Sequence, residues 1–336
     1  MSETLVHDAE ATPAAVPRPS RARLITCWGT VAAMLPYFSI KIAWLSGSTV
    51  GTGGSEVAKS SLFFGLNALT LGMDAVALLT AFTLTYRWGL RVPAWLVVFP
   101  MWVASGFLGL IALGAPPAFL ATALTGSHLS GGSSELVHPW VYGFVYAGFT
   151  GQGVGLAIAF VLHLRSRWPE LFTVRVSGLA RGVSGGTVKV LVTGVCGLAM
   201  LTAAVHLYWA GGGTAGVPPQ AVAGRTLAGC VMEAAHGLLE LVGVAGVLTL
   251  ARRRSTGRLA VPLAAAWLGT GCMFSWSLWG AIGEAFSPIQ NAAQQTVTPL
   301  SLLTIHFQSL AGALLATAAL FLLLEGWSAI RTRPGQ

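Results

Sequence analysis

The sequence predicts an all-α integral membrane protein whose eight transmembrane helices form two parallel four-helix repeats. Three observations lead to this prediction: the apolar composition, eight apolar stretches of membrane-spanning length, and an internal repeat. Hydrophobic residues make up 54% of the chain and charged residues only 9%, with a mean hydropathy of +0.71. Soluble domains carry about 25% charged residues, so this composition indicates a lipid bilayer as the partner of the chain.

Each predicted helix is a stretch that approaches the roughly 20 apolar residues needed to cross a bilayer. In chain order the stretches are 24–45, 64–85, 93–114, 140–163, 188–210, 227–251, 260–283 and 301–325. The first 23 residues are rich in alanine and proline, and we expect them to form a disordered tail. We further expect a first repeat over 24–164, a linker over 165–187, a second repeat over 188–326 and a tail over 327–336.

The internal repeat is clearest at the ends of the first and fifth predicted helices. Residues 40–51 read IKIAWLSGSTVG and residues 205–216 read VHLYWAGGGTAG. An offset of 165 aligns Trp44 with Trp209, and an offset of 166 aligns Asp74 with Glu240. Such self-similarity predicts a duplicated unit. Because four helices return the chain to the side where it began, the two units are expected to run parallel.

Basic residues predict the orientation. Sixteen of the 19 Lys and Arg residues fall on one side of the predicted spans, whereas Lys59 and Arg225 fall on the other. The positive-inside rule then predicts a cell-membrane protein with both termini in the cytoplasm. The net charge of +8 follows from this asymmetry and from attraction to anionic lipid, so it does not indicate nucleic acid. The outer segments 114–138 and 286–299 lack Lys and Arg and are expected to be loops that act as lids.

Ionisable residues inside the spans predict where the function lies, because such a group costs about 3 kcal/mol at membrane depth. Asp74 and Glu240 lie about 18 Å into their helices, near the bilayer midplane. Each belongs to a trio spaced i, i+3, i+7, which places its members on one helical face directed into a bundle: Asn67, Thr70 and Asp74, then Glu233, His236 and Glu240.

The second repeat holds more of these groups than the first. It gathers His206, Glu233, His236, Glu240, Glu284 and His306, whereas the first repeat has Lys41, Asn67, Asp74 and Gln152. We therefore expect the main site to lie among the last four helices.

The leading functional hypothesis is a membrane-embedded terpene cyclase that acts on a lipophilic, prenyl-derived substrate without a cofactor. A buried carboxyl of Asp74, Glu240 or Glu233 would supply the proton as a general acid. Trp44 and Trp209 would stabilise the carbocation with their aromatic faces. Tryptophans at these positions are also typical of the aromatic belt at a membrane interface.

Two alternatives use the same residues differently. In the first, His236 and His306 ligate haem, or histidines with Glu233 and His206 bind a metal ion, in a membrane redox protein. In the second, the acids and histidines form the pathway of a proton-coupled or small-molecule transporter.

Three resemblances accompany these hypotheses. The stretch HLYWAGGGTAG, from His206 to Gly216, resembles a motif of uncharacterised actinobacterial multi-pass membrane proteins and implies no activity. The layout, with histidines early in the sixth and eighth spans, is similar to haem A synthase and implies haem at His236 and His306. At the places of that family's other histidine pair the first repeat has Asn67, Thr70 and Gly148. The combination of buried acids and aromatic residues resembles in character the bacterial membrane-bound terpene cyclases.

Overall fold

The computed structural model describes residues 19–54, 59–126, 137–179, 185–286 and 298–331. Within these residues it has eight helices long and apolar enough to cross a membrane, and it has no strand. The helices are α1 (Arg21–Leu45), α3 (Ser61–Thr85), α4 (Ala94–Thr125), α5 (Pro139–Arg167), α6 (Gly185–Ala210), α8 (Leu227–Arg252), α9 (Ala260–Phe286) and α10 (Pro299–Arg331). The predicted all-α membrane fold with eight spans is confirmed.

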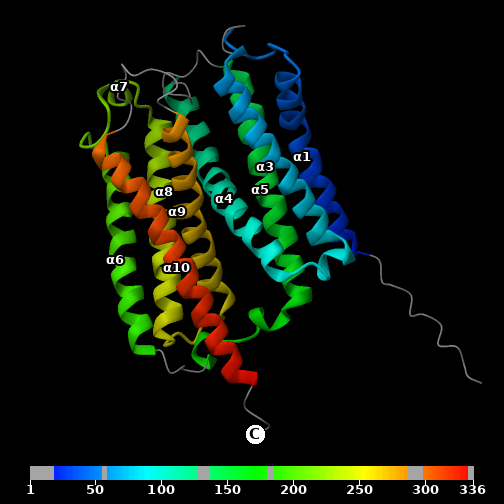
Figure 1. Cartoon of the computed structure of the whole chain (residues 1–336), viewed down its shortest axis with the longest axis vertical. Coiled ribbons are helices and arrows are strands. Elements are labelled where there is room, and N and C mark those ends of the chain that lie inside the picture. Colours follow the sequence, from blue (N-terminus) through cyan, green and yellow to red (C-terminus); the bar gives the residue numbers. More distant parts are fainter. Residues whose placement is uncertain (1–18, 55–58, 127–136, 180–184, 287–297, 332–336) are drawn as a thin grey trace, which may run out of the picture.

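The eight helices pack as two groups of four, joined side by side (Figure 1). In the first group α1 packs against α3 and α5, and α5 packs against α4. In the second group α6 packs against α8 and α10, and α10 packs against α9. Helix α4 joins the groups, because it contacts both α8 and α9. The described helices thus share one pattern of neighbours, while the origin of the two halves from one duplicated unit stays a prediction.

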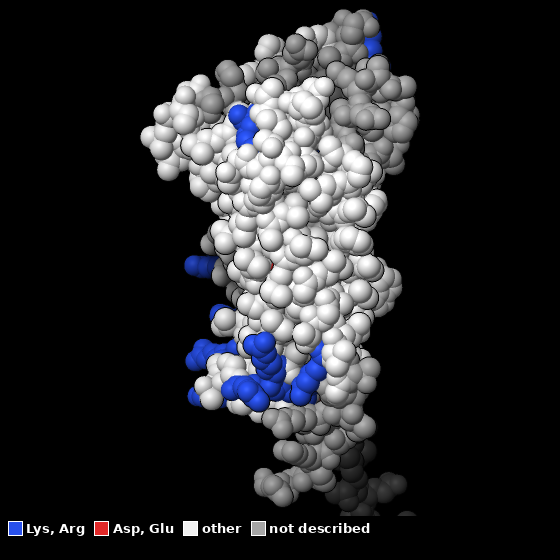
Figure 2. Space-filling model, turned by 90° about the vertical axis from the view of Figure 1, so that its left-hand side faces the viewer, with Lys and Arg blue, Asp and Glu red and all other residues white. Residues whose placement is uncertain are grey.

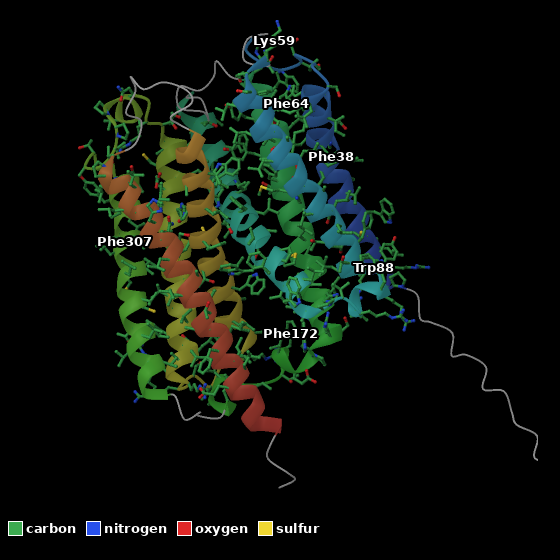
Figure 3. All side chains as sticks on the ribbon, in the orientation of Figure 1. Phe38, Lys59, Phe64, Trp88, Phe172 and Phe307 are labelled. Atoms are coloured by element: carbon green, nitrogen blue, oxygen red, sulfur yellow. The ribbon has the colours of Figure 1, made fainter. Side chains whose placement is uncertain are left out.

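The two ends of the bundle differ in charge. Helix α1 begins and α10 ends at the same end, and Figure 2 shows most of the visible Lys and Arg side chains gathered there. Trp88, between Arg87 and Arg91 in the sequence, lies at this end, and Lys59 lies at the opposite one (Figure 3). We call the two ends the basic end and the α7 end, after the short helix α7 (Pro219–Ala223). Which side of a membrane each end faces stays a prediction.

Small residues bring the groups together. A Cβ atom at Gly106 of α4 would meet the backbone of Gly271 of α9, so only glycine allows the two helices this close approach. Two indole hydrogen bonds cross the same contact: Trp102 Nε1 donates to Thr270 Oγ1 over 3.1 Å, and Trp267 Nε1 donates to Ser105 Oγ over 2.6 Å. The interface between the groups is therefore held by shape and by polar bonds.

The prediction that the third helix ends near residue 114 is wrong, because α4 continues through Pro116 and Pro117 to Thr125. Prolines are tolerated in membrane helices where neighbouring groups make up for the lost hydrogen bonds. The extension is also packed, since Ala115, Ala118 and Ala121 are buried. The rest of this expected lid, 127–136, and most of the second, 287–297, lie outside the described residues, as does most of the expected N-terminal tail.

The expected linker 165–187 is packed against the second group over part of its length. It contains the short 3-10 helices η2 (Pro169–Phe172) and η3 (Val176–Gly178). Val176 and Leu179 are buried in the apolar core of the second group. The backbone of Arg175 forms an isolated antiparallel β-bridge with that of Arg258.

The turns that follow α1 and α6 have the same geometry. Gly47 and Gly51 have φ values of +90° and +72°, and Gly212 and Gly216 have +93° and +75°. These left-handed conformations suit glycine, which has no Cβ. Trp44 Nε1 donates to the carbonyl of Val50 over 2.7 Å, and Trp209 Nε1 donates to that of Ala215 over 2.9 Å. The aligned tryptophans therefore close equivalent turns.

Candidate functional site: a buried cluster of histidines and carboxylates

Each group holds a buried carboxylate near the middle of a helix, Asp74 on α3 and Glu240 on α8. In the first group Lys41 Nζ lies 2.7 Å from Asp74 Oδ2, and both side chains are buried. The ammonium also lies 4.0 Å from the centre of the Tyr37 ring, and Gln152 is within hydrogen-bonding reach of Asp74. Each charge of this first-group pair thus has a direct partner.

In the second group Glu240 is surrounded by neutral or titratable side chains. Thr202 Oγ1 donates to Glu240 Oε2 over 2.7 Å, and Gln308 Nε2 donates to Oε1. The Nε2 atoms of His206 and His236 lie 3.5 and 3.9 Å from Oε1. We define the second-group cluster as five residues: His206, Glu233, His236, Glu240 and Gln308.

The two histidine rings stack, with centroids 4.2 Å apart and planes at 18°. Glu233 Oε2 lies 2.7 Å from His206 Nδ1, and Gln308 Nε2 lies 2.8 Å from His236 Nε2. An amide NH₂ only donates, so the contact with Gln308 requires a lone pair on His236 Nε2, and the contact with Glu233 suits a hydrogen on His206 Nδ1. Among the described residues His206 Nε2 has no hydrogen-bond partner.

Helical periodicity explains this convergence. Glu233, His236 and Glu240 share one face of α8, as their spacing predicts, and Thr202 and His206 are one turn apart on α6. Gln308 reaches the same point from α10, where Ser277 of α9 donates to its Oε1 over 2.7 Å. All four helices of the second group therefore contribute a polar side chain.

A pocket of about 310 Å³ lies at the α7 end of this cluster. Its lining includes Trp209, Arg225, Thr226, Cys230, Glu233 and Ser301. The Glu233 side chain is 40% exposed, whereas that of Glu240 is 0% exposed. Glu233 is thus the member of the cluster that lines the pocket, and His206 lies directly behind it.

The structure divides the sequence-predicted site residues between the two groups. Glu240, Glu233 and His236 meet in the second-group cluster, and Trp209 lines the adjoining pocket. Asp74 instead binds Lys41, and Trp44 is buried against Phe63 in the first group.

The expected pairing of His236 with His306 lacks support. His306 is exposed on α10 and lies two residues before Gln308, about 200° around the helix, and Gln308 is the residue that contacts His236. The side chain of Glu284 lies outside the described residues.

Sequence reasoning missed the polar groups that complete the cluster. Thr202 and Ser277 give no sequence signal, because hydroxyl groups in membrane helices commonly bond to their own backbone, as Thr80 and Thr83 do. Gln308 could have been found as an amide on the face of its helix opposite His306. Trp276 has a buried Nε1 without a hydrogen-bond partner among the described residues, and its ring lies 6.4 Å from that of His236.

The arrangement offers two kinds of chemistry. The dyad of Glu233 and His206 can exchange protons with a molecule in the pocket, and the lone pairs around Glu240 can bind a cation. Comparison with protein-family models, with curated proteins and with solved structures found no match to this chain.

Proposed function

We propose that this protein is a membrane-embedded enzyme that protonates a lipophilic small molecule held in the pocket at the α7 end. The observation that carries the proposal is the position of Glu233, which lines the pocket and whose Oε2 lies 2.7 Å from His206 Nδ1. A carboxyl that lines a pocket and is bonded to an imidazole has the arrangement of a general acid or base.

The reaction class that fits best is that of a terpene cyclase acting on a prenyl-derived substrate. Trp209 lines the same pocket as Glu233, so an aromatic ring that could stabilise a carbocation belongs to the same site as the acid. The pocket volume of about 310 Å³ is at the lower end of the range for small-molecule sites. Asp74 is the weaker candidate for the acid because it pairs with Lys41, and Glu240 is weaker because it is fully buried.

The test compares Glu233→Gln with wild-type protein in membranes of a heterologous host that are supplied with farnesylated or epoxidised prenyl compounds. Glutamine keeps the oxygen that accepts from His206 but has no proton to give, so turnover should fall by about 10² or more. The products are extracted and identified by mass spectrometry. His306→Ala, an exposed histidine on α10, is the control and should keep wild-type activity.

Two results would remove the proposal. The first is the absence of any new isomeric product with wild-type protein, and the second is full activity of Glu233→Gln.

A proton-coupled transporter is the second candidate. It is favoured by the continuous row of polar side chains that starts at Glu233 in the pocket and passes through His206 to Glu240 at mid-helix depth. Under that reading Glu233→Gln would abolish proton movement into proteoliposomes while no isomeric product would form with any variant.

A further inference from the structure

We propose that His206, His236 and Glu240 bind a divalent transition-metal ion, and that Glu233 orients His206 from the opposite side of its ring. One ligand atom from each of the three residues lies within 4.8 Å of those of the other two. Glu240 Oε1 is 3.5 Å from His206 Nε2 and 3.9 Å from His236 Nε2. Tetrahedral zinc with bonds of about 2.0 to 2.1 Å requires ligand separations of about 3.3 Å and lone pairs that converge, so the two stacked imidazoles would have to tilt apart when the ion binds.

The protonation pattern of the two imidazoles suits metal binding. When neutral His206 donates an Nδ1 hydrogen to Glu233, its lone pair is on Nε2. His206 is 7% exposed, and this Nε2 has no hydrogen-bond partner among the described residues. A buried polar atom without a partner is costly, and a metal ion is a partner that its lone pair can accept. A carboxylate behind a metal-binding histidine is also the usual way in which the ring of such a ligand is held.

The first group has a lysine beside its buried carboxylate, whereas the second group has a histidine there. Asp74 and Glu240 occupy aligned places, and each is approached by a glutamine from the last helix of its group. At the position of His206 the first group has Lys41, whose ammonium neutralises Asp74 directly. In the second group no lysine or arginine among the described residues forms an ion pair with Glu240, so a bound cation is a partner that its carboxylate could accept. The lysine of the first group therefore occupies the place that a metal ion would take in the second.

The ligand set indicates the class of ion. Two imidazoles and one carboxylate suit Zn²⁺ and its first-row neighbours, and three protein ligands leave one coordination position open. The inference deepens the proposed function only through Glu233, which would then face the substrate while His206 is fixed by the ion. Metal binding itself can be measured without any substrate.

The experiment uses the full-length protein, purified in detergent, stripped with a chelator and dialysed against Co²⁺ or Zn²⁺ at micromolar concentration. Bound metal is measured by mass spectrometry, and the geometry of the Co²⁺ site by its visible absorption. We expect about one ion per chain and the intense bands of a Co²⁺ ion with few ligands. His306→Ala should leave both unchanged.

Four variants probe the ligands. His236→Ala and Glu240→Gln should lose the ion. His206→Lys should also lose it while the protein still elutes as a single species in size-exclusion chromatography, because the lysine copies the first-group pair. Glu233→Gln should keep the ion with an affinity about 10- to 100-fold lower, as expected for a residue that only orients a ligand.

Wild-type protein that binds no Co²⁺ or Zn²⁺ would overturn the inference, and so would His206→Lys or His236→Ala with an undiminished ion content. The outcome is distinguishable from that of the proposed function. Bound metal without product formation would leave this inference standing and remove the cyclase proposal. Product formation by a protein that binds no added metal would remove this inference and leave the cyclase proposal standing.

Discussion

The two four-helix groups place a carboxylate at the same depth and surround it in opposite ways. Asp74 meets a lysine within its own group, and the pair is sealed from solvent. Glu240 meets two histidines and a glutamine, and the second-group cluster continues through Glu233 to a pocket. The difference teaches that a substitution at one aligned position, Lys41 or His206, goes with a buried acid that is paired with an ammonium in one group and with an imidazole in the other.

The largest expected effect concerns Lys41. Lys41→Met removes the partner of a buried carboxylate and should lower the free energy of unfolding by about 3 to 5 kcal/mol. Thermal unfolding in detergent measures the change. The double variant Lys41→Met with Asp74→Leu should recover most of the loss, since it leaves no buried charge. If the single variant were as stable as wild-type protein, the first-group pair would not be the closed structural contact that distinguishes the two groups.

A smaller effect is expected at the matched glycines. Gly51→Ala and Gly216→Ala each force a side chain into a left-handed conformation, at φ values of +72° and +75°. Each should cost about 1 to 2 kcal/mol for the backbone, with a further cost because the new Cβ would meet Val141 or Leu300. Gly54→Ala, at a glycine with open space around it, is the control. Unequal losses for the two turns would show that they are not equivalent in energy.

The smallest effect is expected at the tryptophans that close these turns. Trp44→Phe and Trp209→Phe each remove one indole hydrogen bond to a carbonyl and should lower stability by about 1 kcal/mol. Only Trp209→Phe should also change the distribution of products, because only Trp209 lines the pocket. A changed product distribution in Trp44→Phe would contradict the assignment of the site to the second group.

The sequence was sufficient to predict the spans and the depth of the acids, because hydropathy and helical periodicity depend on local residues. It could not show that Asp74 pairs with Lys41, since that contact depends on how α1 packs against α3. For a related reason the sequence could not show that Gln308, two residues after His306, is the residue of this helix that contacts His236. Residues two apart lie on nearly opposite faces of a helix, and α10 is apolar on most of its surface, so hydropathy did not reveal which face points inward.

Local sequence preferences also do not predict that α4 extends past Pro116. Proline and glycine at 114–117 are typical of a helix end in water, but here the segment packs on α8. Ala115 and Ala118 are buried there, close to Ala228 and Met232 of α8, so tertiary contacts override the local preference.

This contact places the first group directly against the helix that carries three residues of the second-group cluster. Leu110 of α4 is buried with Leu239 of α8 and Cys272 of α9. Leu239 directly precedes Glu240 in the sequence. A side chain added at Gly114 would meet Met232, the neighbour of Glu233. The first group holds no member of the second-group cluster, but its helix α4 packs against α8, the helix that carries three residues of that cluster. We expect substitutions on this face of α4 to disturb the pocket by displacing α8, and the second group expressed alone to expose that face of α8 to lipid.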